Sequence, residues 1–358
     1  MRVYKNLFNK IIDPENLFLA WDEFKRGKRH KLDVMNFEKN LEQNIFELHR
    51  DLKNKTYAHR GYTDFYIHDP KRRHIHKATV RDRVLHHAVF QIVNPIFEPT
   101  FIIDSFSCRV GKGTHRGVLA AESMLRKVSR NYTRPCYVLK CDVRKFFDTI
   151  NHSIMLSILG KRIKDTDTVA LLREIIGSYR TGRRDRRERE RDEALRAGTP
   201  IGNLTSQLFA NVYMNEFDQF VKQNLKVKCY ARYTDDFIIV SENMEYLRNL
   251  IEPINTFLKT KLKLSLHPNK VEILRCNRGV DFLGSILFPH YRLIRKKTRK
   301  RMIRKLSEKI KLYKQGLISR KSLDQTLQSC LGVFSHSNSY HLSTDLQNQF
   351  WFWLGTSR

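Results

Sequence analysis

The sequence predicts an α+β fold, in which helical segments flank a middle region of short antiparallel strands. Three observations support this prediction. Near the N-terminus, apolar residues recur at three- and four-residue spacing, as in Leu41, Ile45, Leu48 and Leu52, which is typical of an amphipathic helix. In the middle of the chain, short apolar runs alternate with turn residues, which is typical of strands. Residues 291–358 return to helical periodicity and begin with a strongly basic stretch.

The charge balance of the chain points to a polyanionic partner. The 358 residues include 67 Lys or Arg and 37 Asp or Glu, which gives a formal net charge of +30. A folded chain with this excess repels itself unless a polyanion neutralises it. The basic residues are spread along the whole chain, whereas a membrane-surface protein concentrates them on one helix. We therefore expect nucleic acid as the partner, ahead of a membrane surface or an acidic protein.

The cysteines and the N-terminus indicate a cytoplasmic protein. None of the six cysteines forms a Cys-x-x-Cys pair, so the sequence favours neither a zinc ribbon nor a thioredoxin-like motif. We expect them to be small core residues in a reducing cytosol. The N-terminal segment lacks the apolar core of a signal peptide. No apolar run approaches the length of a membrane span, so no membrane partner is expected.

The elements follow one another in four regions. Residues 1–60 are predicted to be helical. Residues 61–136 begin with an alternating pattern around Asp69-Pro70, which predicts a strand, a turn and a second strand. Helical periodicity returns in residues 81–97. Residues 291–358 form the helical, basic end of the chain.

Residues 137–290 hold most of the predicted strands. An apolar strand starts at Tyr137 and ends in a turn, and helices follow it to about Ser178. Later elements are a helix after Gly202, two strands joined at an acidic pair in 229–243, a helix over 244–262, a strand at 270–274 and a small hairpin in 280–294. An inserted charged segment, about 179–197, interrupts this order. Its residues 183–192 hold six Arg and four acids without an apolar face, a pattern usual for a solvated loop or exposed helix.

Three carboxylates form the most informative pattern. Tyr233-Thr234-Asp235-Asp236 lies between two apolar segments. Adjacent acids in a hairpin turn are costly to hold together without a cation, although Asp is also a common turn residue. Upstream, Asp142 follows the apolar strand that starts at Tyr137. If this strand lies beside the hairpin, three carboxylates converge, as phosphoryl transfer with two metal ions about 3.5–4 Å apart requires.

At these residues the chain resembles reverse transcriptases. Four ordered motifs, which together are far more specific than any one alone, are LKCDVRKFFDTI (139–150), IGNLTSQLFANVY (201–213), YTDD (233–236) and Phe282-Leu283-Gly284. The resemblance implies a right-hand polymerase. Its parts would be a helical N-terminal segment (1–60), fingers (61–136), a palm of antiparallel sheet plus helices (137–290) and a helical basic thumb (291–358).

One segment distinguishes subtypes within this resemblance. Group II intron and many retroviral-type enzymes carry Gln-Gly followed by Ser-Pro where this chain has Ile201-Gly202 and Ser206-Gln207. This form, with residues 81–89 and 104–115, resembles the reverse transcriptases of diversity-generating retroelements. Those enzymes copy a template-repeat RNA, misincorporate opposite adenines and feed a variable region of a target gene by mutagenic retrohoming. The alternative is a reverse transcriptase of a bacterial antiphage-defence (antiviral) system.

The resemblance implies catalytic roles residue by residue. Asp142, Asp235 and Asp236 match the metal-binding acids, and Val143, which follows Asp142, is placed with them. Lys270 matches the lysine suggested as proton donor to pyrophosphate. The implied metal is a pair of Mg²⁺ ions, which prefer oxygen ligands, with Mn²⁺ as a substitute.

Eight residues are implied to contact the dNTP or the template. Phe147 matches the bulky gate that clashes with a ribose 2′-OH, although a core aromatic is the plainer interpretation. The basic residues match finger positions near the triphosphate and template, but basic residues in turns are often only solvated. The full set is Lys71, Arg73, Arg109, Lys112, Phe147, Gly202, Gln207 and Tyr233.

The implied partners are template RNA, an RNA/DNA hybrid and dNTPs. Residues 291–305 carry nine Lys or Arg and no acid, which suits a helix lying along template–primer phosphates. The retroelement resemblance adds a small basic helical accessory protein, itself a candidate homo-oligomer.

Two other function classes share such a fold. A non-catalytic RNA-binding protein with a decayed polymerase fold is disfavoured, because a decayed enzyme is expected to lose at least one of Asp142, Asp235 and Asp236. An RNA-templated RNA polymerase is disfavoured by Phe147, because a small or polar residue there would admit ribose.

Overall fold

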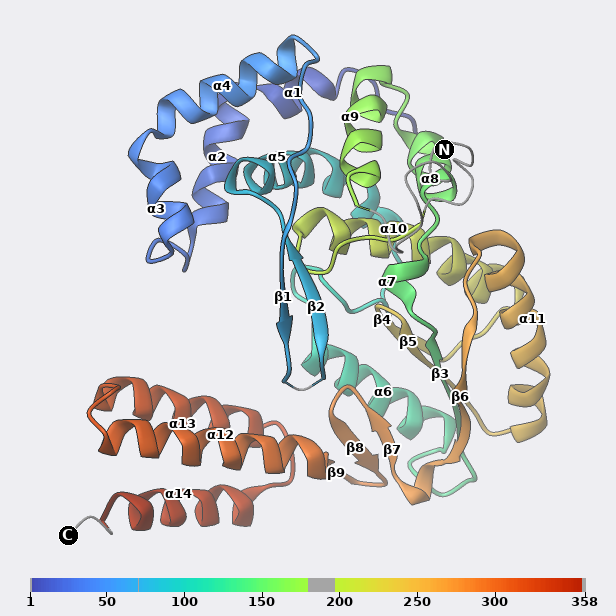
Figure 1. The fold of residues 1–358 in the computed structure, drawn as a ribbon. Helices are drawn as coiled ribbons and strands as arrows, with labels where there is room; N and C mark the ends of the chain where they lie inside the picture. Colours follow the sequence, from blue (N-terminus) through green and yellow to red (C-terminus); the bar gives the residue numbers. More distant parts are fainter. Residues whose placement is uncertain (1, 70, 180–196, 356–358) are drawn as a thin grey trace. The chain divides into compact units, whose positions relative to one another are not determined.

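A computed structural model describes residues 2–69, 71–179 and 197–355 as a mixture of helices and strands (Figure 1). The predicted combination of helices and sheets is confirmed. The chain forms two compact units. The first unit comprises residues 1–108, 142–228 and 251–269, and the second comprises residues 109–141, 229–250 and 270–358.

Helices form the N-terminal part of the first unit, as the apolar spacing predicts. Ile45, Leu48 and Leu52 are buried along one face of the fourth helix. Asp13 caps the second helix by accepting a hydrogen bond from the N–H of Glu15 at 2.9 Å. The four helices are α1 (Phe8–Ile12), α2 (Pro14–Lys25), α3 (Leu32–Lys39) and α4 (Leu41–Lys53).

A two-stranded hairpin and a long helix follow in the first unit. β1 (Thr63–Ile67) pairs antiparallel with β2 (Arg73–Lys77), which confirms the predicted strand–turn–strand. Thr79 then caps α5 (Val80–Phe97) by accepting a hydrogen bond from the N–H of Asp82. A short 3₁₀ turn, η1 (Glu98–Thr100), ends this helix.

Helix α10 (Leu204–Gln219) is the most deeply buried helix of the first unit. Eleven of its residues are buried, and it packs against α5 and α8. A helix enclosed on nearly all sides belongs to the core of a domain. It continues as a π-helical turn, η3 (Phe220–Asn224). Three further helices lie wholly within this unit: α7 (Phe146–Thr149), α8 (His152–Arg162) and α9 (Thr166–Gly177).

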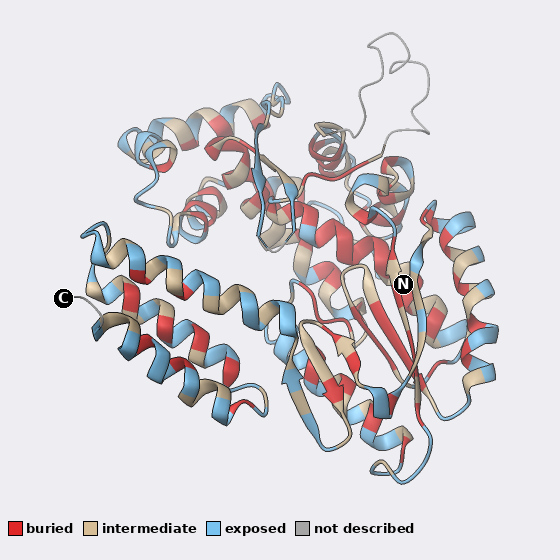
Figure 2. Ribbon diagram, turned by 60° about the horizontal axis from the view of Figure 1, so that its bottom comes forward, coloured by how far each residue is buried: buried red, intermediate tan, exposed pale blue. Residues whose placement is uncertain are grey.

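The main sheet has the strand order β4-β5-β3-β6. β4 and β5 are almost wholly buried (Figure 2), and α6 (Thr114–Val128) packs against both. α11 (Met244–Leu262) follows β5 and has the predicted bounds. The strands are β3 (Tyr137–Val143), β4 (Tyr230–Tyr233), β5 (Asp236–Ser241) and β6 (Leu266–Arg275).

The region expected to be a small hairpin is a three-stranded antiparallel sheet. After the 3₁₀ turn η4 (Cys276–Arg278), it contains β7 (Val280–Phe282), β8 (Ser285–Phe288) and β9 (Tyr291–Ile294). Leu283 and Gly284 join the first two strands with φ angles of 50° and 89°. A two-residue loop with both φ angles positive matches the twist of an antiparallel pair.

Three helices form the C-terminal part of the second unit, as predicted: α12 (Lys296–Lys314), α13 (Arg320–Phe334) and α14 (Tyr340–Gly355) (Figure 1). They share one apolar core. The buried members of that core are Leu306, Ile310, Leu323, Leu327, Cys330, Phe334, Leu346 and Phe350.

Two expectations need correction or fall outside the described ranges. Four of the six cysteines are buried, but Cys108 is exposed and Cys229 is only half-buried. Cys108 lies in the loop before α6, where its backbone is left-handed (φ 53°), so the core prediction is wrong there. The Arg-rich residues 183–192 lie outside the described residues. Within the described ranges, no helix is long and apolar enough to cross a membrane.

Candidate active site

The Tyr233–Asp236 segment is a tight hairpin in the second unit. Tyr233 is the strand partner of Asp236, so Thr234 and Asp235 form a two-residue loop. Thr234 has a left-handed backbone with a φ of 57°, which makes a β-branched residue a genuine outlier and costs about 1–2 kcal/mol. Such strain persists only where the surrounding structure imposes it, and it is common at functional sites.

Arg232 stabilises this loop through a hydrogen bond to its backbone. Its side chain is fully buried, and its Nη1 donates a hydrogen bond to the carbonyl oxygen of Thr234 at 2.9 Å. A buried guanidinium needs hydrogen-bond acceptors to offset its lost hydration, and the loop supplies one. Asp235, in the loop, and Asp236, the first residue of β5, are both half-buried.

Asp142 lies on the strand next to this hairpin in the sheet. It is half-buried and follows the buried Cys141 in β3. β3 is the neighbour of β5, and β5 begins with Asp236. Among the described residues, no group of three or more His, Cys, Asp or Glu is arranged as a metal-binding cluster. The convergence of the three carboxylates, with Val143, therefore stays a prediction.

Phe147 follows a sharp turn after β3. Lys145 has a left-handed backbone (φ 46°) and precedes α7. Phe146 is buried and Phe147 is half-buried, with their ring centroids 5.2 Å apart. The carbonyl oxygen of Phe147 accepts a hydrogen bond from the N–H of Thr199 at 2.7 Å. Phe146 is thus the core aromatic of the pair, and Phe147 is the more accessible ring.

Gly202 lies against the β1–β2 hairpin within the first unit. Its φ is 119°, and a Cβ there would lie 3.0 Å from Cγ2 of Ile75. The N–H of His76 donates to the carbonyl oxygen of Ile201 at 3.2 Å. Nδ2 of Asn203 donates a hydrogen bond to the carbonyl oxygen of His76 at 3.4 Å. The glycine is therefore required by both its backbone angle and this close approach.

Gln207 is exposed on α10, although its neighbours Ser206 and Leu208 are buried. Its side chain therefore faces away from the core, where a polar partner can reach it.

The predicted basic residues lie in both units. Lys71 and Arg73 are exposed at the β1–β2 turn of the first unit. Arg109 and Lys112 are half-buried in a turn before α6, in which the N–H of Lys112 donates to the carbonyl oxygen of Arg109 at 3.2 Å. Lys270 is half-buried in β6, also in the second unit. Their meeting at one site stays a prediction.

The sequence interpretation missed a row of neighbouring aromatic rings that runs from the hairpin to Tyr179. Tyr66 stacks on His74 with centroids 4.4 Å apart, and His74 lies 4.2 Å from His76. His76 in turn lies 4.6 Å from Tyr179. Burial and the neighbouring His74 lower the pKa of His76, despite opposing carboxylates. The alternation His74-Ile75-His76 was the available signal, because residues two apart share one face of a strand.

Comparison with known proteins agrees with these motifs. A family model described as reverse transcriptase (RNA-dependent DNA polymerase) matches residues 67–287. The chain is similar to Protein YkfC of Escherichia coli K12, with 26% identity over 62% of this chain and 62% of that protein. It is similar to the group II intron-encoded protein LtrA of Lactococcus lactis, with 22% identity over 79% of this chain and 56% of that protein.

A third relative is the nuclear intron maturase 1, mitochondrial, of Arabidopsis thaliana, with 20% identity over 58% of this chain and 40% of that protein. The chain thus spans between 40% and 62% of the length of these three relatives.

Proposed function

Since the chain belongs to the reverse transcriptase family, we propose that it is an RNA-directed DNA polymerase that copies a template RNA into cDNA. The observation that carries this proposal is the strained hairpin at Thr234, which holds Asp235 in its loop and Asp236 at the start of the buried strand β5. The sheet order supports it, because β3, the strand of Asp142, is the neighbour of β5.

Asp142, Asp235 and Asp236, together with Val143, would hold two Mg²⁺ ions, for which Mn²⁺ can substitute. Their oxygen donors fit a hard divalent cation that completes its shell with water and substrate phosphates. Bound ions of this kind activate the attacking hydroxyl and stabilise the leaving oxygen. Lys270 would hold the proton that passes to pyrophosphate.

The remaining site residues would bind and select the substrates. Phe147 excludes a ribose 2′-OH by steric clash. Gly202, Gln207 and Tyr233 lie against the nascent base pair and template. The four basic residues that hold the triphosphate and template are Lys71, Arg73, Arg109 and Lys112. In this proposal the fingers (61–136), palm (137–290) and thumb (291–358) form a right hand.

The subtype that we propose is the polymerase of a diversity-generating retroelement, error-prone at template adenines and working with a small basic accessory protein in the cytoplasm. The Ile201-Gly202 and Ser206-Gln207 pairs support this choice. Similarity to an intron-encoded protein and an intron maturase favours a second candidate, an intron-type reverse transcriptase. An antiphage-defence reverse transcriptase is the third.

The test is Asp235→Asn in Mg²⁺-dependent primer extension on poly(rA)/oligo(dT). The variant should lose polymerisation but keep its melting temperature and RNA binding, because clustered carboxylates repel each other without metal. Asp22→Asn is the matched control, since Asp22 is an exposed acid paired with Lys25 on α2. Activity of Asp235→Asn within about tenfold of wild type would refute the assignment.

A further inference from the structure

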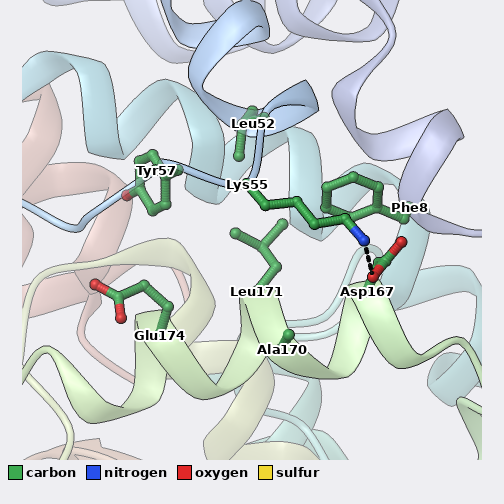
Figure 3. Close-up of a pocket in the computed structure, with 8 residues that line it drawn as sticks. All are labelled: Phe8, Leu52, Lys55, Tyr57, Asp167, Ala170, Leu171 and Glu174. Carbon is green, nitrogen blue, oxygen red and sulfur yellow. Dashed lines mark hydrogen bonds and ion pairs between the residues drawn. The ribbon is translucent and has the colours of Figure 1, made fainter.

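A small pocket opens in the first unit between α9, α1 and the segment that follows α4 (Figure 3). Its volume is about 230 Å³. Sites for drug-sized ligands usually measure roughly 300–1,000 Å³, so this pocket suits one long side chain better than a nucleotide or cofactor. None of its lining residues belongs to the proposed polymerase site. They are Phe8, Leu52, Lys55, Tyr57, Asp167, Ala170, Leu171 and Glu174.

The floor and one wall of the pocket are apolar and held in place. Leu52 and Leu171 are buried, and the small side chain of Ala170 lines the pocket beside Leu171 on α9 (Figure 3). Tyr57 forms a wall, and its hydroxyl donates a hydrogen bond to Oδ1 of Asp82 at 2.8 Å. The guanidinium of Arg81 lies 4.9 Å from the centre of the Tyr57 ring. An occupant therefore meets a preformed apolar surface.

The rim of the pocket carries two acids from the same face of α9. Asp167 and Glu174 are seven residues apart, which is about two helical turns, or roughly 10 Å. Oε1 of Glu174 accepts a hydrogen bond from the N–H of His59 at 2.9 Å. Oδ1 of Asp167 accepts one from Nζ of Lys55 at 2.7 Å. The rim is therefore net acidic on a chain whose formal charge is +30.

The Lys55–Asp167 ion pair is open to exchange. The two side chains are 64% and 40% exposed, and exposed pairs of this kind contribute little to stability. A stronger donor can thus replace Lys55 at Asp167 with little loss. At physiological salt, charges beyond about 8 Å are largely screened, so the local acids rather than the net charge decide what binds.

We propose that this pocket is a docking site for an arginine side chain of a basic protein partner. The arginine stem would lie on Leu52 and Leu171, since long basic side chains bury their methylenes along apolar surface. Its guanidinium would bind the carboxylate of Glu174, because its donors match a carboxylate bidentately, and Asp167, about two turns away on α9, would add to the acidic rim. The two carboxylates repel phosphate, which excludes nucleic acid. The proposal does not depend on the polymerase assignment.

The first test uses n-butylguanidinium as a probe of the full chain, followed by ligand-observed NMR. Saturable binding is expected with a Kd in the millimolar range, as for a ligand of this size. Glu174→Gln removes the charge but keeps the oxygen that accepts from His59, and Ala170→Leu fills the pocket. Each should weaken binding about fivefold or more, whereas Glu245→Gln, at an exposed acid paired with Arg248 on α11, should not.

The second test uses a helical peptide of Ala, Leu and Gln with one central arginine, and its glutamine counterpart. The arginine peptide should bind wild type at least about tenfold tighter than the glutamine peptide, and Glu174→Gln should remove that difference in a double-mutant cycle. Equal binding of both peptides, or of n-butanol and n-butylguanidinium, overturns the proposal. Tighter binding of spermidine than of the arginine peptide would indicate a polyamine site instead. Primer extension by both variants should match wild type.

Discussion

Thr234, Lys145 and Gly202 share a backbone property that side-chain chemistry alone does not reveal. Each has a positive φ, and each lies within two residues of a position proposed to act in the reaction. Only Gly202 could be expected from the sequence, because glycine is the usual residue in that conformation. Thr and Lys avoid it, so the left-handed conformations of Thr234 and Lys145 required the structure, although the sequence predicted a turn at both places.

Phe147→Ala should increase incorporation of rNTPs relative to dNTPs. The half-buried ring stands beside the core residue Phe146, and its removal would relieve the clash with a 2′-OH at the transition state. Single-nucleotide insertion kinetics with matched dNTP and rNTP pairs measure the effect. Phe146→Ala is the contrasting variant and should reduce stability instead. Unchanged sugar selectivity in Phe147→Ala would show that Phe147 only packs.

His87 should make the first unit less stable in mild acid. Burial, then the charges of Lys28 and Arg83, lower its pKa to about 4. The unfolded chain, with an imidazole pKa of about 6.5, binds more protons than the folded chain between these values. The free energy of unfolding therefore falls as pH drops from about 6.5 toward 4.

Urea unfolding at pH 7 and pH 5 measures this dependence. Wild type should lose free energy of unfolding between pH 7 and pH 5, and His87→Gln should make that loss smaller by about 1–2 kcal/mol. The buried His86, whose pKa is also lowered by burial, keeps a second contribution in the variant. His341→Gln, at an exposed position of α14, is the control. A pH dependence identical to wild type in His87→Gln would contradict the assignment.

Among the elements, α12 is the one for which the structure refines the sequence prediction. Arg292 and Arg295 belong to the nine cations of residues 291–305, but they form ion pairs with Glu122 and Asp281. The exposed cations at the start of α12 are better candidates for phosphate contacts. They are Lys296, Lys297, Arg299 and Lys300.

Replacing these four cations by Gln should weaken template–primer binding and flatten its salt dependence. The slope of log K against log salt should decrease by about 3 if all four contact phosphates, at roughly 0.7–0.9 per contact. Filter binding at several salt concentrations provides the slope. The matched control replaces four exposed lysines elsewhere: Lys226, Lys259, Lys261 and Lys263. An equal decrease in slope for the control set would show that overall charge, rather than contact with α12, determines the salt dependence.

Local patterns in the sequence were sufficient for most helices and hairpins. The bounds of α11 and the hairpin at the acidic pair follow from periodicity and turn residues, which act over a few positions, although Asp236, expected in the turn, is the first residue of β5. The contact between Gly202 and Ile75, by contrast, joins segments that are far apart in the sequence. The hydrogen bond between the neighbouring residues Asn203 and His76 spans 127 residues. Such pairings depend on how α10 and the hairpin pack in the folded unit. No local pattern contains that information, and the pocket beside α9 was missed for the same reason.

At the scale of the whole molecule, the retroelement proposal predicts how errors distribute. The enzyme alone should copy its native template RNA poorly and should work in a complex with a basic helical accessory protein. Sequence-specific RNA choice usually needs a dedicated surface for single-stranded loops, which the motifs of this chain do not provide. Misincorporation should concentrate opposite template adenine, and sequencing of cDNA from the reconstituted complex measures it.

Ile201→Gln is the informative variant for this prediction. It restores the more common Gln-Gly pair at the position proposed to lie against the nascent base pair, so errors at adenine should decrease while polymerisation continues. Ile201 is half-exposed, and the exchange leaves its carbonyl oxygen, which accepts from His76, in place. An even distribution of errors over all four template bases in wild type would refute the retroelement subtype. The reverse transcriptase assignment would stand, and the antiphage-defence and intron-type candidates would lead.

The meeting of Gly202 with Ile75 also limits how this chain can evolve. A side chain at position 202 is opposed twice, by a backbone angle of 119° and by the methyl group of Ile75. A smaller residue at position 75 relieves only the second obstacle, so no single exchange opens the position. The backbone angle alone therefore keeps position 202 constrained, whichever residue occupies position 75. Among descendants of this sequence, we expect position 202 to stay glycine through changes that the neighbouring helix α10 tolerates.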